Sequence, residues 1–182
     1  MLTQSLTLEE FLQRPETKPT SEFINGEIIS KPMPQGEHSR LQSKLCGEIN
    51  RVAEAAKIAY GFNELRCTFG KKSIVPDISV FEWQRIPRSA SGRIANRFET
   101  YPDWAIEILS PNQQQTRALS NLLHCAEYGT KLGWLIYPEE DKVLVVFPEA
   151  KVQFYEGDGK LPILDDIDLD LTPAKIMGWL NF

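Results

Sequence analysis

Residues 103–110, DWAIEILS, form a short apolar run that contains one glutamate, Glu107. Aliphatic residues flank Glu107 on both sides, and a nearly continuous run of this kind is typical of a strand buried on both faces of a central sheet. An isolated ionised carboxylate is costly there unless it is paired, hydrogen-bonded or bound to a metal ion. The stretch therefore predicts a central strand and a partner for Glu107.

A second apolar stretch with an acid lies upstream, at residues 75–83, VPDISVFEW. Asp77, taken alone, could point to water from a strand edge. If the two stretches are neighbouring strands, their side chains approach within about 5 Å, so Asp77 and Glu107 can share one Mg²⁺ or Mn²⁺. Asp103 lies four residues from Glu107 on one strand, about 13 Å away and too far to share an ion. We therefore expect Asp103 to cap the turn that enters the strand.

The rest of the chain alternates between helical and strand patterns. Asn25-Gly26 between two alternating apolar arms predicts a tight β-hairpin near the N-terminus. Helices are expected at about 7–14, 37–57, 113–128 and from 172 onward, and further strands at 64–70, 73–82, 132–138, 142–148 and 151–157. This order predicts one domain over residues 1–182 with an α/β (mixed α+β) fold. Its central mixed sheet is flanked by helices, with the hairpin at the N-terminus.

The composition argues against several classes of protein. The 182 residues are 42% hydrophobic and 25% charged, which is ordinary for a soluble chain. No apolar run approaches the roughly 20 residues of a membrane-spanning helix, and no secretory signal is seen, so we expect a cytoplasmic protein with no membrane partner. Three widely spaced cysteines provide neither a disulfide framework nor a CxxC metal site. A net charge of −5 argues against general coating of nucleic acid.

Few other residues suggest a catalytic or metal-binding role. His124 fits a packed helix position, whereas His38, near the start of the long helix, could reach the carboxylates through the preceding loop. A single histidine without a cysteine or histidine neighbour does not favour zinc. No phosphate-binding loop or serine nucleophile elbow is present, and no organic cofactor is expected.

A basic segment, residues 84–100, lies between the two acidic strands and has no apolar period. It carries four arginines, Arg85, Arg88, Arg93 and Arg97. Because it joins the two strands, we expect it to emerge near Asp77 and Glu107. It is either a solvated loop or a lid that contacts phosphates.

Pro76-Asp77, followed about thirty residues later by Glu107-Ile108-Leu109-Ser110-Pro111, resembles the PD-(D/E)xK restriction-endonuclease-like superfamily. More narrowly, the chain resembles the superfamily's Uma-two branch, formerly a domain of unknown function. That match rests on SEFINGEII, PMPQGEHSRLQ, VPDISVF, EILSP and HCAEYGTKLGWLIYP, in this order over about residues 5–147.

The resemblance implies a restriction-endonuclease-like core and a homodimeric endonuclease that hydrolyses DNA with Mg²⁺ (or Mn²⁺). It implies that Asp77 and Glu107 bind the metal, with the Ile108 carbonyl as a third ligand. It also implies that Glu22 is an outer carboxylate of the same site. An ion held there would activate water and stabilise charge on a phosphodiester.

One departure from the superfamily pattern concerns its lysine, which stands two residues after the acid. That position is Leu109 here, and relatives with a lysine on the following helix would place it near Asn121. The remaining cations are Lys31 and Arg117, and an arginine stays protonated and cannot act as a base.

Three hypotheses follow from this departure. The chain is an active endonuclease in which Lys31 or Arg117 stabilises the transition state, or a catalytically impaired descendant that binds nucleic acid or regulates as a dimer. A third hypothesis, a structural protein, predicts a buried, protonated Glu107 with a raised pKa.

Overall fold

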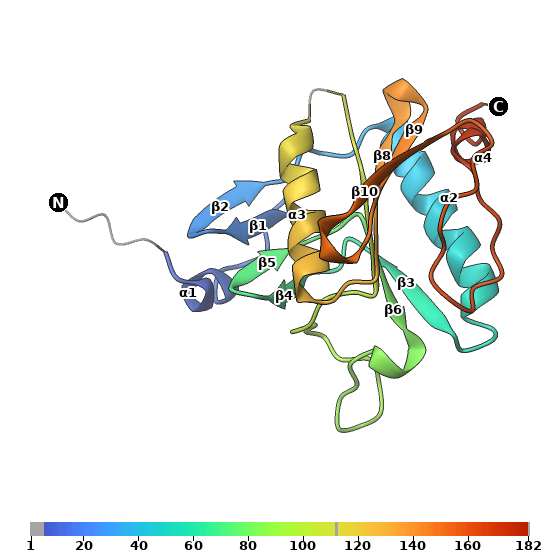
Figure 1. The fold of residues 1–182 in the computed structure, drawn as a ribbon. Coiled ribbons are helices and arrows are strands. Elements are labelled where there is room, and N and C mark those ends of the chain that lie inside the picture. The colour runs from blue at the N-terminus through green and yellow to red at the C-terminus, as the bar shows by residue number, and fades with distance from the viewer. Residues whose placement is uncertain (1–5, 112, 182) are drawn as a thin grey trace.

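The computed structural model describes residues 6–111 and 113–181 and shows two β-sheets with helices on both sides (Figure 1). The six-stranded sheet has the order β10-β9-β8-β7-β6-β3, and the four-stranded sheet has the order β2-β1-β5-β4. The helices are α1 (Leu8–Leu12), α2 (Gly36–Ala53), α3 (Gln115–Tyr128) and α4 (Pro173–Gly178). The strands are β1 (Ser21–Ile24), β2 (Glu27–Ser30), β3 (Ala59–Asn63), β4 (Cys67–Phe69), β5 (Lys72–Ile74), β6 (Ile78–Glu82), β7 (Trp104–Ile108), β8 (Leu132–Tyr137), β9 (Lys142–Val146) and β10 (Val152–Glu156).

The six-stranded sheet is mixed, as predicted. β7 and β8 run parallel and are joined through α3, while the other neighbouring pairs run antiparallel. In Figure 1 the sheet is seen nearly edge-on, with α3 on one face and α2 on the other. All five residues of β7 are buried, which confirms the central strand predicted from DWAIEILS. Glu107 shares a strand face with Ala105, whose hydrophobic cluster includes residues of α3, so Glu107 points toward α3.

The predicted hairpin and helix ends are confirmed with small shifts. Asn25 and Gly26 have φ values of 53° and 85°, the left-handed conformation that the turn between β1 and β2 requires. α3 ends at Gly129, which takes φ 116°. The helix expected to reach residue 57 ends at Ala53. No helix in the described part of the chain is both long and apolar enough to cross a membrane.

The strand predicted over residues 73–82 is wrong as a single element. Residues 72–74 form β5 in the small sheet and residues 78–82 form β6 in the large one. Pro76 cannot donate to a ladder, so residues 75–77 pass from one sheet to the other. Residues 59–63, for which we predicted no element, form the edge strand β3, whose central Gly61 weakens the local strand pattern.

The expectation that residues 84–100 lie near the carboxylates is also wrong. The segment joins the end of β6 to the start of β7, whereas Asp77 precedes β6 and Glu107 lies at the far end of β7. The loop therefore emerges at the opposite end of the sheet, the lower end in Figure 1. Arg85 is held there by the buried Asp103, with its Nη1 atom 2.6 Å from Asp103 Oδ1. The other Asp103 oxygen accepts the Glu82 amide at 2.8 Å, so Asp103 secures the turn into β7, as predicted.

Candidate active site

The ladder between β6 and β7 brings the two predicted acids together. Ile78 pairs with Ile106, which places Asp77 next to Glu107 at the end of the antiparallel pair. Asp77 Oδ2 accepts the Ile108 amide at 2.7 Å, so the Asp77 carboxylate continues the ladder where the β6 backbone leaves the sheet. Asp77 and Glu107 are 1% and 2% exposed. Charges buried this deeply need a partner.

The partner is Lys31, which follows β2 of the N-terminal hairpin. Its Nζ atom lies 2.8 Å from Asp77 Oδ1 and 3.4 Å from Glu107 Oε2. The same ammonium donates to the Val75 carbonyl at 2.7 Å. Lys31 was one of two cations that the sequence left open, and the structure places it between the two acids.

The first turns of α2 supply the other side of the site. His38 Nε2 lies 3.4 Å from Asp77 Oδ1, and His38 Nδ1 lies 3.1 Å from the Ser110 hydroxyl. One turn later, the Gln42 amide donates to the Asp77 carbonyl at 2.8 Å. Sequence reasoning left His38 open and missed Gln42 and Ser110. The available signal was the spacing of His38 and Gln42, which puts both on the face of α2 that the apolar pattern turns inward.

Glu22 and Arg117, both predicted for the site, form an adjoining cluster. Glu22 accepts the Val75 amide at 2.8 Å and the Arg117 guanidinium at 2.8 Å, and the Asn121 amide lies 3.3 Å from both Glu22 oxygens. Arg117 also donates to the carbonyls of residues 29 and 30. The guanidinium therefore ties the hairpin to α3. A cavity of about 10 Å³ lies between this cluster and the Lys31–Glu107 pair.

The charges of Lys31, Asp77 and Glu107 depend on one another. Burial raises the pKa of Glu107 to about 8, and the attraction of Lys31 offsets only part of this rise. Burial also opposes ionisation of Asp77, but Lys31 and then His38 outweigh it and hold the pKa of Asp77 below its ordinary value. For Lys31, burial is outweighed by the nearby carboxylates, Glu107 first, and the pKa is raised. Lys31 therefore stays cationic and does not serve as a base at neutral pH.

Leu109, at the position of the superfamily's lysine, is buried in the hydrophobic cluster beneath α3 and carries no charge. Lys31 brings an ammonium to the acids from a different element, so the site contains a cation although the motif position does not. Within residues 6–111 and 113–181, no group of three or more His, Cys, Asp or Glu side chains is arranged around a metal position. The site offers two carboxylates that face one cation, with main-chain groups beside them. Two such oxygens suit Mg²⁺, which commonly takes only one or two protein carboxylates.

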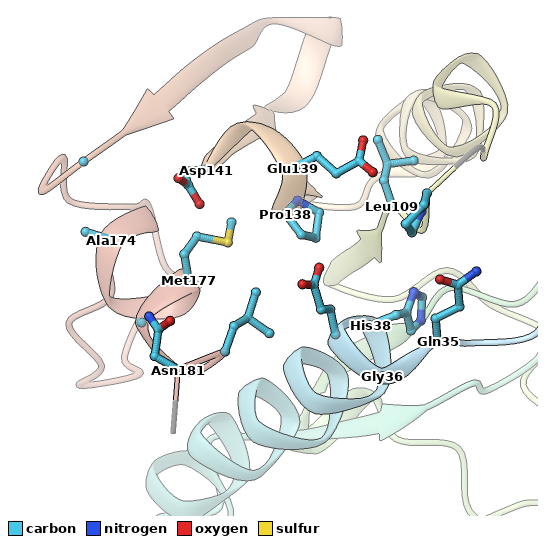
Figure 2. A pocket seen from close by; sticks show the side chains of 15 residues that line it. Gln35, Gly36, His38, Leu109, Pro138, Glu139, Asp141, Ala174, Met177 and Asn181 are labelled. Carbon is cyan, nitrogen blue, oxygen red and sulfur yellow. The ribbon is translucent and has the colours of Figure 1, made fainter.

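Two hollows meet at His38. One, of about 220 Å³, is lined by Lys31, Asp77 and His38 together with residues 18–20, 32–34, 64, 75 and 113. The other, of about 1050 Å³, lies between the start of α2, the turn after β8 and α4 (Figure 2). Exposed acids on its walls, Glu139 and Asp141 among them, disfavour phosphate there. The smaller hollow therefore gives the more suitable access to the carboxylates for an anion.

The fold is that of a restriction-endonuclease-like protein. A family model described as "Putative restriction endonuclease", Uma2, matches residues 8–174, and the chain belongs to this family. Its structure is similar to the crystal structure of a protein from Anabaena variabilis ATCC 29413, described as a putative nuclease belonging to DUF820. The two share 50% sequence identity and a TM-score of 0.94, over 96% of this chain and 99% of that one. No curated protein matches the chain.

Proposed function

We propose that the protein is an endonuclease that hydrolyses DNA phosphodiester bonds with Mg²⁺ or Mn²⁺ and acts as a homodimer. The observation that carries the proposal is the Lys31 ammonium placed on both Asp77 and Glu107. Family membership and the similarity to a putative nuclease support the reaction class. DNA is the substrate that the family's description suggests.

Asp77 and Glu107 would hold the metal through the oxygens that now contact Lys31. The Ile108 carbonyl is the third candidate ligand, because the N–H and C=O of one strand residue face the same neighbour and the Ile108 amide already contacts Asp77. A bound Mg²⁺ or Mn²⁺ would lower the pKa of a coordinated water and stabilise charge on the phosphate.

The cations of the site divide into two roles. If Asp77 and Glu107 held a divalent ion through the oxygens that now contact Lys31, the ammonium would give up at least one of these contacts and would be available to stabilise the negative charge of the transition state. Arg117, the alternative cation, is ion-paired with Glu22 and donates to a carbonyl of the hairpin, so it is not available for the phosphate. Glu22 supports the site from outside by holding the Val75 amide beside Lys31. His38 and Gln42 orient Asp77.

The direct test is cleavage of supercoiled plasmid with Mg²⁺ or Mn²⁺. We expect nicking by the unaltered chain, none with EDTA, and none for Asp77→Ala or Glu107→Gln. Asp158→Ala, which changes an exposed acid on a turn, serves as the matched control and should cleave normally. Cleavage that survives Asp77→Ala would show that the activity comes from elsewhere.

A second candidate function is a catalytically impaired nuclease-fold protein that binds nucleic acid or regulates as a dimer. Leu109 favours it, because the superfamily's lysine position is apolar and buried. Calorimetric titration with Mn²⁺ separates the two. An active site should bind the ion in an Asp77-dependent manner, and an impaired one should not.

A further inference from the structure

The six-stranded sheet ends at β10 in an exposed apolar edge. β10 pairs with β9 along all five of its residues and forms the border of the sheet. Val152 and Phe154 are 53% and 58% exposed, although they continue the sheet face of the buried Val146 and Leu144. An open edge strand with apolar side chains is a template for pairing with another strand.

The main-chain groups at this edge point outward. The Phe147 amide donates to the Lys151 carbonyl at 2.8 Å, which makes these two residues a hydrogen-bonded pair of the ladder. Alternate residues of an antiparallel strand bond to the same neighbour, so Gln153 and Tyr155 also face β9. Val152 and Phe154 therefore turn their N–H and C=O groups to the open side.

The other border of the same sheet is closed. There the Asn50 side chain, from α2, accepts the Gly61 amide at 2.7 Å and donates to the Gly61 carbonyl at 2.9 Å. These contacts satisfy the outward main-chain groups at the middle of β3. The residues that the structure describes provide no such cap at Val152 or Phe154. The chain thus blocks one edge with a side chain and leaves the other open.

We propose that β10 pairs with β10 of a second copy in antiparallel orientation about a two-fold axis. This inference rests on the homodimer proposed above and gives it an interface. Only outward-facing residues can exchange main-chain hydrogen bonds. In the register that sets Val152 opposite Phe154 of the second copy, these two residues exchange both of their main-chain hydrogen bonds, and the two-fold axis repeats the pair. It joins the two apolar faces and brings no like charges opposite each other, since Lys151 then faces Tyr155.

This register puts Gln153 on the two-fold axis, opposite its own copy, as a pair without main-chain bonds. The Cα atoms of such a pair are about 4.5 Å apart, within the range for a disulfide. Gln153→Cys should therefore form a covalent dimer with oxidised glutathione. Lys151→Cys should not, because the two copies of residue 151 lie four positions apart in this register, about 13 Å. The three native cysteines are buried, and the unaltered chain should stay uncross-linked.

Association without a cross-link is measured by sedimentation equilibrium on the full chain. We expect a dimer for the unaltered protein and a monomer for Phe154→Glu. Ile94→Glu changes a side chain of similar exposure, 51%, on the basic loop and should leave the dimer intact. A monomeric unaltered chain, a dimer that survives Phe154→Glu, or equal cross-linking at 151 and 153 would overturn the interface. If Gln153→Cys forms the covalent dimer but the unaltered chain does not cleave DNA, the interface is supported and the proposed nuclease activity fails.

Discussion

The Lys31 ammonium lies 2.8 Å from Asp77 Oδ1, although the two residues are 46 positions apart in the chain. It also lies 3.4 Å from Glu107 Oε2, so one internal cation contacts both buried acids. The N-terminal hairpin makes this contact possible, because β1 pairs with β5 immediately before the Val-Pro-Asp crossing. Lys31 thus compensates the buried charge of Asp77 in the metal-free protein and supplies the cation that Leu109 does not.

Replacing the ammonium should strongly reduce DNA cleavage. Lys31→Met keeps much of the side chain's length and removes its charge. We expect cleavage to fall about 100-fold or more, the usual effect of losing one group that stabilises transition-state charge. Plasmid nicking rates at saturating Mg²⁺ measure the change. Lys44→Met, which removes a partly exposed lysine that pairs with Glu48 on α2, is the control and should cleave at the normal rate. A Lys31→Met chain with full activity would exclude Lys31 from catalysis.

The coupling between Lys31 and Asp77 can be measured as stability. Asp77→Ala removes one of the two acids from a buried ammonium, and we expect the free energy of unfolding to fall by about 3–5 kcal/mol in EDTA. Lys31→Met combined with Asp77→Ala should recover part of this loss, because the unpaired charge is gone. Urea denaturation of the two single variants and the double variant completes the cycle. Purely additive losses would show that the two residues are not coupled.

The stability of the metal-free protein should fall as the pH rises from about 5 to 8. The pKa of Glu107 is raised from 4.5 to about 8, so in this window the folded chain holds a proton that the unfolded chain has released. The stability that Glu107 contributes is present at low pH and is lost as the pH rises through about 8, by at most about 1.4 kcal/mol per pH unit. Asp77 does not oppose this trend. Its pKa is lowered in the folded chain from 3.8, so the stability that it contributes is lost only as the pH falls below that value, outside this window.

Urea titrations at several pH values in EDTA measure this slope. Glu107→Gln, which cannot titrate, should flatten it, whereas Glu139→Gln changes an exposed acid and should not. The same slope in Glu107→Gln as in the unaltered chain would assign the titration to another group.

Metal affinity should change with pH in the opposite direction. A carboxylate must be deprotonated to bind a metal ion, so Mn²⁺ has to displace the proton on Glu107 below about pH 8. Calorimetric titration should therefore show tighter Mn²⁺ binding at pH 8 than at pH 6, with proton release at the lower pH. Asp77→Ala should abolish the binding. Binding of equal strength at both pH values would place the ion away from Glu107.

The chain's local chemistry is sufficient to predict several elements. The Asn25-Gly26 turn, the buried β7 strand and the end of α3 at Gly129 follow from turn preferences and apolar patterns within a few residues. That Glu107 needs a partner also follows from its apolar neighbours. Its pairing with Asp77 was expected only if the two stretches were neighbouring strands, and the β6–β7 register meets that condition. The break at Pro76 was missed for the opposite reason. Both flanking segments suit a strand, and only their docking decides that they belong to different sheets.

The sequence by itself determined most of the strands, the N-terminal hairpin turn and the two acids that need a partner. The tertiary structure decided which residues meet those acids and which do not. The docking of the hairpin brings Lys31 to Asp77, while the antiparallel order of β6 and β7 sends the arginine loop to the far end of the sheet. Ladder register and sheet docking depend on contacts between distant segments, so no local pattern specifies them.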